Sequence, residues 1–262
     1  MCGIAGYSLS ADSRVERTLA AQALLAGIAE RGSDAVGYAH RSPDEPIRVH
    51  KQRSGASALL EQISVPAGST EVLVHVRDYT KGHPTIAANN HPIRHGAVVG
   101  IHNGIIFNDD ELLAEHGIPR AEPEMTVDSE AIFALAEQAE EHVRALEQLR
   151  GSMATAWLDE RRPRVVYVAR GVGRPVCLGS SREHTFFAST ERALEVVEQF
   201  LRLRLRKEEL PEGTLLSLEN GRERSREQFS PDRAFEETPL PPVRAPHEGA
   251  LSLKRLAALA AL

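Results

Sequence analysis

The residue best equipped for chemistry is Cys2, which directly follows Met1. A small side chain at this position permits removal of the initiating methionine. Cys2 would then carry a thiol and a free α-amine on a single Cα. Because an α-amine titrates at about 7.7–8.0, part of it is an unprotonated base at neutral pH. A thiol needs such a base, or a lowered pKa, to attack a carbonyl carbon. The residues alone leave two interpretations open, a nucleophile or a buried inert thiol.

Other polar residues at the ends of apolar runs leave similar alternatives. Arg77 follows the β-rich run 71–76, and Asn103-Gly104 follows the apolar run 97–101. Asn-Gly is an ordinary turn dipeptide, and its donors can also stabilise an oxyanion. Arg77 and Asp128 could form a surface ion pair or bind a charged substrate. A long loop from Asp78 to Arg94 lies between these groups, and loops of that length are more often functional than idle.

Histidines cluster in the same part of the sequence and raise the question of a metal. They are His75, His83, His91, His95 and His102. No pair among them has tight zinc spacing supported by cysteines, so we expect loop and strand histidines and no metal site. Cys177 lies in the β-like run Val176-Cys177-Leu178 and is expected in the core.

The composition is that of a water-soluble globular protein without a nucleic-acid partner. Of the 262 residues 42% are hydrophobic and 26% charged, and the net charge is −6. An acidic balance argues against a dedicated nucleic-acid binder. No apolar run approaches the roughly 20 residues of a membrane helix, and no signal peptide is recognisable. Two cysteines do not make a disulfide framework, so we expect both reduced in the cytoplasm.

The apolar pattern predicts many strands with helices between groups of them. Two sheets covered by helices is the architecture that this order favours. Helices are expected at 14–30, 57–63, 109–116, 127–139 and 191–200. Strands are expected at 3–9, 36–41, 47–53, 71–76, 97–101, 153–158, 165–169, 176–179, 185–188, 201–207 and 214–218.

The composition changes after Phe229. Five prolines between positions 231 and 246 indicate a tail without a core pattern. Leu253, Leu256 and Leu259 recur three apart, so we expect a short C-terminal helix that docks on the body or on a partner. We therefore divide the chain into a domain at 2–229 and a Pro-rich tail at 230–262.

Several stretches, taken together and in order, resemble the class II glutamine amidotransferases. Within that family the likeness is greatest to the glutaminase domain of glutamine–fructose-6-phosphate aminotransferase. It covers roughly residues 2 to 220. The matching segments are Met1-Cys2-Gly3-Ile4, Arg31-Gly32-Ser33-Asp34-Ala35-Val36-Gly37, Arg77 with Thr80 and Gly82, Asn90-His91-Pro92, 99–108, Asp128-Ser129-Glu130, Leu149-Arg150-Gly151, Ala169-Arg170-Gly171 and Phe187-Ala188-Ser189.

The resemblance implies an α+β fold, the four-layer αββα sandwich of the N-terminal nucleophile hydrolases. It also implies hydrolysis of the glutamine side-chain amide to glutamate and ammonia through a Cys2 thioester. Asn103 and Gly104 would stabilise the oxyanion, while Arg77 and Asp128 would bind the α-carboxylate and α-ammonium of glutamine. Thr80 would shape that pocket, and Arg31 and Asp34 would brace the loop near Cys2. No cofactor is implied.

The sequence departs from the family in two respects. Asp78 and Lys81 stand where the aminotransferase has Trp and His, at positions that help to cover bound glutamine. The sugar-phosphate-binding half is also missing from this sequence. We therefore expect a glutaminase that supplies ammonia to a separate synthase subunit; homo-oligomer formation stays open. Two alternatives remain, an amidohydrolase for another γ-glutamyl compound and a non-catalytic regulatory relative.

Overall fold

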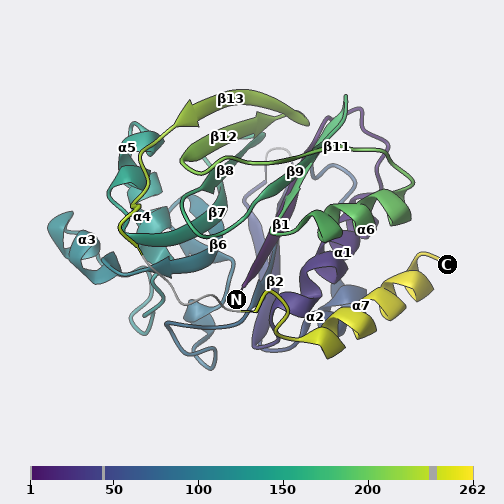
Figure 1. Cartoon of the computed structure of the whole chain (residues 1–262), viewed down its shortest axis with the longest axis horizontal. Helices are drawn as coiled ribbons and strands as arrows, with labels where there is room; N and C mark the ends of the chain where they lie inside the picture. The colour runs from purple at the N-terminus through teal and green to yellow at the C-terminus, as the bar shows by residue number, and fades with distance from the viewer. Residues whose placement is uncertain (1, 43–44, 236–240, 262) are drawn as a thin grey trace.

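Two antiparallel sheets packed face to face form the centre of the computed structural model, which describes residues 2–42, 45–235 and 241–261. Met1, whose removal the sequence predicts, lies outside the described residues. The seven-stranded sheet has the order β11-β9-β10-β1-β4-β2-β3 and the six-stranded sheet the order β13-β12-β8-β7-β6-β5. Helices cover both outer faces, with α3, α4 and α5 on one side and α1, α2, α6 and α7 on the other (Figure 1). The predicted four-layer αββα sandwich is confirmed.

The seven-stranded sheet contains β1 (Gly3–Leu9), β2 (Ala35–Arg41), β3 (Arg48–Gln52), β4 (Glu71–Arg77), β9 (Cys177–Ser180), β10 (His184–Ala188) and β11 (Arg206–Glu209). The N-terminal strand β1 lies between β4 and β10. The second sheet contains β5 (Ile93–His95), β6 (Val98–Ile106), β7 (Gly151–Asp159), β8 (Val165–Arg170), β12 (Thr214–Glu219) and β13 (Arg222–Gln228).

The helices follow the predicted positions closely and add one. They are α1 (Arg17–Ile28), α2 (Ala56–Leu59), α3 (Asp109–Glu115), α4 (Glu130–Gln138), α5 (His142–Glu147), α6 (Glu191–Leu201) and α7 (Pro246–Leu259), with short 3-10 turns η1 (Ala29–Arg31), η2 (Leu60–Gln62) and η3 (Ala87–Asn89). Within the described residues, none of these helices is long and apolar enough to cross a membrane.

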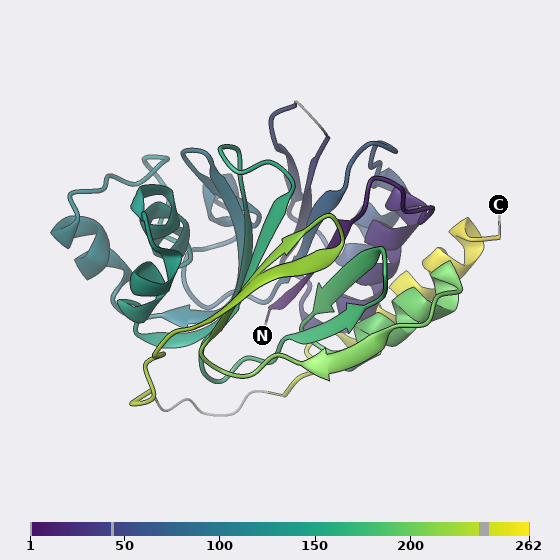
Figure 2. The ribbon, with the colours of Figure 1, turned by 90° about the horizontal axis from the view of Figure 1, so that it is seen from above.

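Three buried clusters correspond to the three interfaces between the layers. One lies between the first sheet and its helices and includes Leu24, Val74 and Leu256. A second includes Phe133 and Trp157 beside α3, α4 and α5. The third fills the space between the sheets, where alternate strand residues face each other. Figure 2 shows the two sheets edge on, with helices outside both.

The structure corrects several expected boundaries. The run 201–207 is not one strand, because Arg202 caps α6 in the left-handed conformation with φ of 54° and β11 begins only at Arg206. Leu203 and Leu205 pack instead in the buried cluster between the seven-stranded sheet and its helices. Strand β13 was missed because its sequence, RERSREQ, has no apolar face, as befits an exposed edge strand.

The short C-terminal helix expected from the leucine spacing forms, and it starts at Pro246. It packs on α1, α2 and η1, and Leu256 is fully buried in the cluster between the seven-stranded sheet and its helices. The helix therefore docks on the body of this chain. The division at residue 229 stays a prediction.

Candidate active site

Strand register brings the ends of three strands together around Cys2. In the β1–β4 pair Gly3 faces Val76, and in the β2–β4 pair Ala35 faces Arg77. Cys2 precedes the first residue of β1, so it lies beside Arg77, the last residue of β4. Asp34 directly precedes β2, and its backbone N–H donates to the Arg77 carbonyl at 2.9 Å. Residues far apart in the sequence thus meet at one end of the first sheet.

Two hydrogen bonds hold Cys2, one through its thiol and one through its backbone carbonyl. Its Sγ donates to the backbone carbonyl of Asp78 at 3.5 Å, and Arg31 Nε donates to the Cys2 carbonyl at 2.9 Å. Burial raises the pKa of the Cys2 thiol, although the positive charges of Arg77 and Arg31 act in the opposite direction. The thiol is therefore protonated at neutral pH and needs a base before it can attack.

Arg77 organises the loop that follows it. Its guanidinium donates to Asn90 Oδ1 at 2.6 Å, to the Lys81 carbonyl at 2.9 Å and to the Gly82 carbonyl. Asn90 in turn donates from Nδ2 to the Pro84 carbonyl at 2.8 Å. Both ends of the loop are thus tied to one buried cation. The sequence did not reveal that Asn90 connects Arg77 to the loop, because Asn90 stood out there only through the family resemblance.

Asp34 fixes the first turn of the same loop. Its Oδ2 accepts a hydrogen bond from the Tyr79 backbone N–H at 2.9 Å. Thr80 follows as an exposed residue. Gly82 has φ of +78°, and a Cβ there would lie 3.0 Å from Val127 Cα. A glycine is therefore required where the loop packs against the segment that carries Asp128.

Asn103 and Gly104 lie within strand β6, opposite Ala154 and Met153 of β7. The interpretation as a turn dipeptide is wrong, because the strand continues to Ile106. Asn103 is 1% exposed, and neither atom of its side-chain amide has a hydrogen-bond partner among the described residues. Gly104 has φ of +148°, and a Cβ there would meet the Ser152 carbonyl at 2.0 Å. A buried amide without a partner is costly unless a ligand satisfies it.

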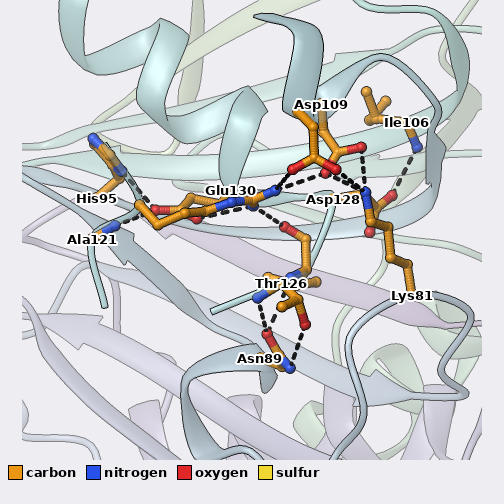
Figure 3. Close-up of polar contacts among 12 residues, drawn as sticks. Lys81, Asn89, His95, Ile106, Asp109, Ala121, Thr126, Asp128 and Glu130 are labelled. Atoms are coloured by element: carbon orange, nitrogen blue, oxygen red, sulfur yellow. Dashed lines mark hydrogen bonds and ion pairs between the residues drawn. The ribbon is translucent and has the colours of Figure 1, made fainter. Parts of the chain in front are cut away.

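Asp128 lies next to the end of β6. Its Oδ2 accepts a hydrogen bond from the Ile106 backbone N–H at 2.7 Å (Figure 3). Burial raises the pKa of this carboxyl to about 6. Burial lowers the pKa of Arg77, and the nearby Asp128 carboxylate acts in the opposite direction. The hydrogen bonds of Arg77 and Asp128 go to other groups, which argues against a simple ion pair between them.

A charged network next to Asp128 ties the loop to helices α3 and α4. Lys81 Nζ lies 2.7 Å from both oxygens of Asp109 and 3.0 Å from Asp110, at the start of α3 (Figure 3). Arg120 bridges Asp109 and Glu130, each at 3.0 Å. Lys81, singled out in the sequence only as a departure, is therefore engaged within the chain.

Asn89 makes a second connection between the loop and this region. Its Oδ1 accepts from the backbone N–H groups of Thr126 and Val127, at 2.8 and 3.0 Å. Its Nδ2 donates to the Thr126 hydroxyl at 3.2 Å. Asn89 was not singled out from the sequence. The one signal for it is its place beside Asn90 in a loop rich in turn formers.

Three histidines lie behind the site and remain neutral. His75 and His91 stack with ring centroids 4.2 Å apart, and His75 Nε2 lies 3.0 Å from the His102 carbonyl. Burial lowers the pKa of His75 and of His102 to about 3. Within the described part of the chain, no group of three or more His, Cys, Asp or Glu side chains is arranged to hold a metal ion.

Comparison with known proteins agrees with this geometry. A family model described as a glutamine amidotransferase domain matches residues 76–196, which span Arg77, Asn103, Gly104 and Asp128. Glutamine–fructose-6-phosphate aminotransferase from Chlamydia pneumoniae is 33% identical over 211 residues, and that from Escherichia coli strain K12 is 30% identical over 207. This chain contains a class II glutamine amidotransferase domain.

The amidotransferase chain spans about a third of the curated relatives that it matches. Both alignments cover 74% of this chain and 32% of the relative. Among solved structures, glutamine phosphoribosylpyrophosphate amidotransferase from Bacillus subtilis, in complex with ADP and GMP, superposes with a TM-score of 0.68 at 20% identity. That match covers 87% of this chain and 49% of the other, and it supports the fold of the amidotransferase domain.

Proposed function

We propose that this domain hydrolyses the side-chain amide of glutamine to glutamate and ammonia. The observation that carries the proposal is the buried Asn103 amide beside Gly104, whose hydrogen-bonding atoms have no partner among the described residues. A buried amide of this kind is suited to donate a hydrogen bond to an oxyanion that forms only during the reaction. Arg77 and Asp128 supply opposite charges close to Cys2, as required for an amino-acid substrate.

The chemistry starts from a protonated thiol. After removal of Met1, the α-amine of Cys2 accepts the thiol proton while Sγ attacks the amide carbon. The carbonyl oxygen becomes an oxyanion, to which Asn103 Nδ2 and the Gly104 N–H donate. The amine returns the proton to the leaving nitrogen, the C–N bond breaks and ammonia departs. Water then hydrolyses the thioester to glutamate and restores Cys2.

The substrate is expected to bind between Arg77, at the end of β4, and Asp128, beside the end of β6. The Arg77 guanidinium binds the α-carboxylate, and the Asp128 carboxylate binds the α-ammonium. Because Arg77 also holds the Lys81 and Gly82 carbonyls, glutamine binding and loop order are coupled. Arg31 and Asp34 support Cys2 and the loop, and Thr80 lies on the exposed turn over the site.

The alternative substrate, another γ-glutamyl compound, was motivated by Asp78 and Lys81. Both side chains form ion pairs within the chain, with Arg244 and with Asp109 respectively. Their charges are thus used internally, and glutamine remains the better-supported substrate. A regulatory relative without catalysis has no comparable observation in its favour.

We also propose that the ammonia is passed to a synthase, in a separate subunit or a further domain. The support is that the matched relatives are named aminotransferases and that this chain covers about a third of their length.

Both cysteines are free thiols, which suits a cytoplasmic location.

The test is glutamate release from glutamine by purified protein whose N-terminus has been established. Protein that begins at Cys2 is expected to release glutamate and ammonia in equal amounts. Asparagine, which is one methylene shorter, serves as the matched control and should react far more slowly. If protein beginning at Cys2 leaves glutamine intact, the proposal fails.

A further inference from the structure

The segment that leads into α7 is anchored to η1, whose Arg31 contacts Cys2. The backbone N–H groups of Arg244 and Ala245 both donate to the Glu30 carbonyl at 2.8 Å. Glu30 precedes Arg31, which donates to the Cys2 carbonyl. In α7 itself, a Cβ added to Gly249 would lie 2.8 Å from Glu30 Cβ. The entry to α7 is therefore fixed against η1.

Helix α7 has anchors of its own that do not involve the active-site loop. The Glu248 carboxylate accepts from the Ser57 backbone N–H at 3.0 Å and lies 3.2 Å from the Ser57 hydroxyl, at the start of α2. Arg255 donates to the Ser57 carbonyl, and Leu256 is fully buried. Figure 1 shows α7 alongside α1 and α2. The helix thus holds in place the preceding segment, which carries Arg244.

Arg244 connects this support to the loop over Cys2. Its Nε lies 3.1 Å from Asp78 Oδ2, and the Asp78 carbonyl accepts the hydrogen bond from Cys2 Sγ. The two side chains are 41% and 23% exposed, so the pair contributes little to global stability. Its effect should be local, on the turn 78–82 that contains Thr80 and supplies two carbonyls to Arg77.

We propose that Arg244 is a positioning residue for glutamine hydrolysis. Its ion pair with Asp78 holds the turn 78–82 in the conformation that receives glutamine. The C-terminal segment thereby becomes part of the active-site architecture. The inference rests on the proposed function for its kinetic readout, but the order of the turn can be measured without any activity.

The experiment compares Arg244→Ala, Arg244→Lys and Asp78→Asn in the full chain. Arg255→Ala is the matched control, because it removes an arginine of α7 that contacts Ser57 and not the turn. Amide hydrogen exchange of peptides covering 78–82 is measured beside KM and kcat for glutamine. Loss of an exposed ion pair corresponds to a change of about two- to fivefold in KM.

We expect Arg244→Ala and Asp78→Asn each to accelerate exchange in 78–82 and to raise KM by about two- to fivefold, with kcat within about twofold. The double variant should show no additional loss, since both changes break one pair. Arg244→Lys should recover most of the effect, and Arg255→Ala should show none of it.

Unchanged exchange in Arg244→Ala would overturn the proposal. So would an equal change in Arg255→Ala, because that result would mean that the helix acts only through its docking. If the unsubstituted protein hydrolyses no glutamine, the proposed function fails, and the exchange data still decide whether Arg244 positions the turn.

Discussion

The Cys2 thiol donates a hydrogen bond to the backbone carbonyl of Asp78 across 3.5 Å, which links the nucleophile to the loop that covers it. Burial keeps this thiol protonated, so its reactivity depends on the α-amine that removal of Met1 would expose. The four variants below each test one component of this arrangement.

Replacement of Cys2 by Ala should abolish glutamine hydrolysis. We expect a loss of at least about a thousandfold in kcat, because no other group can form the thioester. Cys177→Ala is the matched control, since Cys177 is buried in β9 and should leave kcat unchanged. Glutamate release by both purified variants is the measurement. Comparable loss in the two variants would contradict the assignment.

Asn103→Ala should lower kcat by about 10²–10³-fold with little change in KM, because the amide acts on the oxyanion and not on bound glutamine. Since neither amide atom has a partner among the described residues, the change removes no hydrogen bond from the folded chain. The midpoint of thermal unfolding should therefore change little. A large loss of stability with unchanged kcat would show that Asn103 is structural.

Asp128 should make both binding and stability depend on pH. Its pKa is raised from 3.8 to about 6 in the folded chain, so its charged form is lost as the pH falls through 6. KM for glutamine should rise below that pH, because the neutral acid cannot pair with the substrate ammonium. Kinetics between pH 5 and 8 provide the measurement, and a KM that is flat over this range argues against the role.

The same shift fixes the sign of the stability effect. The protonated form is favoured by folding, so its stabilisation is complete below pH 3.8 and is lost as the pH rises through about 6. Asp128→Asn should therefore be more stable than the unsubstituted protein at pH 8, by up to roughly 3 kcal/mol. Urea unfolding at pH 5 and pH 8 checks this. If Asp128→Asn is less stable than the unsubstituted protein at pH 8, burial does not disfavour the charged form of Asp128.

Lys81→Met should raise KM by about two- to fivefold through loss of its ion pairs with Asp109 and Asp110. Stability should change little, because Arg120 remains paired with Asp109 at 3.0 Å. The matched control is Lys207→Met, which breaks the ion pair between Lys207 of β11 and Glu198 of α6. Steady-state kinetics of both variants decide; equal KM values would show that Lys81 does not order the loop.

The sequence predicted the layers and suggested most of the candidate site residues, because both depend on local patterns. Apolar runs predicted β1, β4 and α6, and ordered short motifs singled out Cys2, Arg77, Asn103 and Asp128. Pairings between distant segments left no such signal. The contacts of Arg244 with Asp78, of Lys81 with Asp109 and of Asn89 with Thr126 depend on how loops pack after the sheets have formed.

The Asn103-Gly104 pair shows why context decides between local alternatives. As a dipeptide it favours a turn, yet in this fold it continues a strand, because β7 pairs with it through Ile106. Because Gly104 has no Cβ, it can keep its positive φ inside the sheet and let the Ser152 carbonyl approach closely. A tertiary contact overrides the local preference there, and sequence reasoning alone had no access to it.

The most direct test of the central claim is the intact mass of the protein before and after treatment with diazo-oxo-norleucine, an electrophilic analogue of glutamine. The account predicts that the active protein lacks Met1 and gains one adduct that peptide mapping places on Cys2, with glutamine protecting against it. Active protein that retains Met1, or an adduct on Cys177 with Cys2 untouched, would contradict the claim.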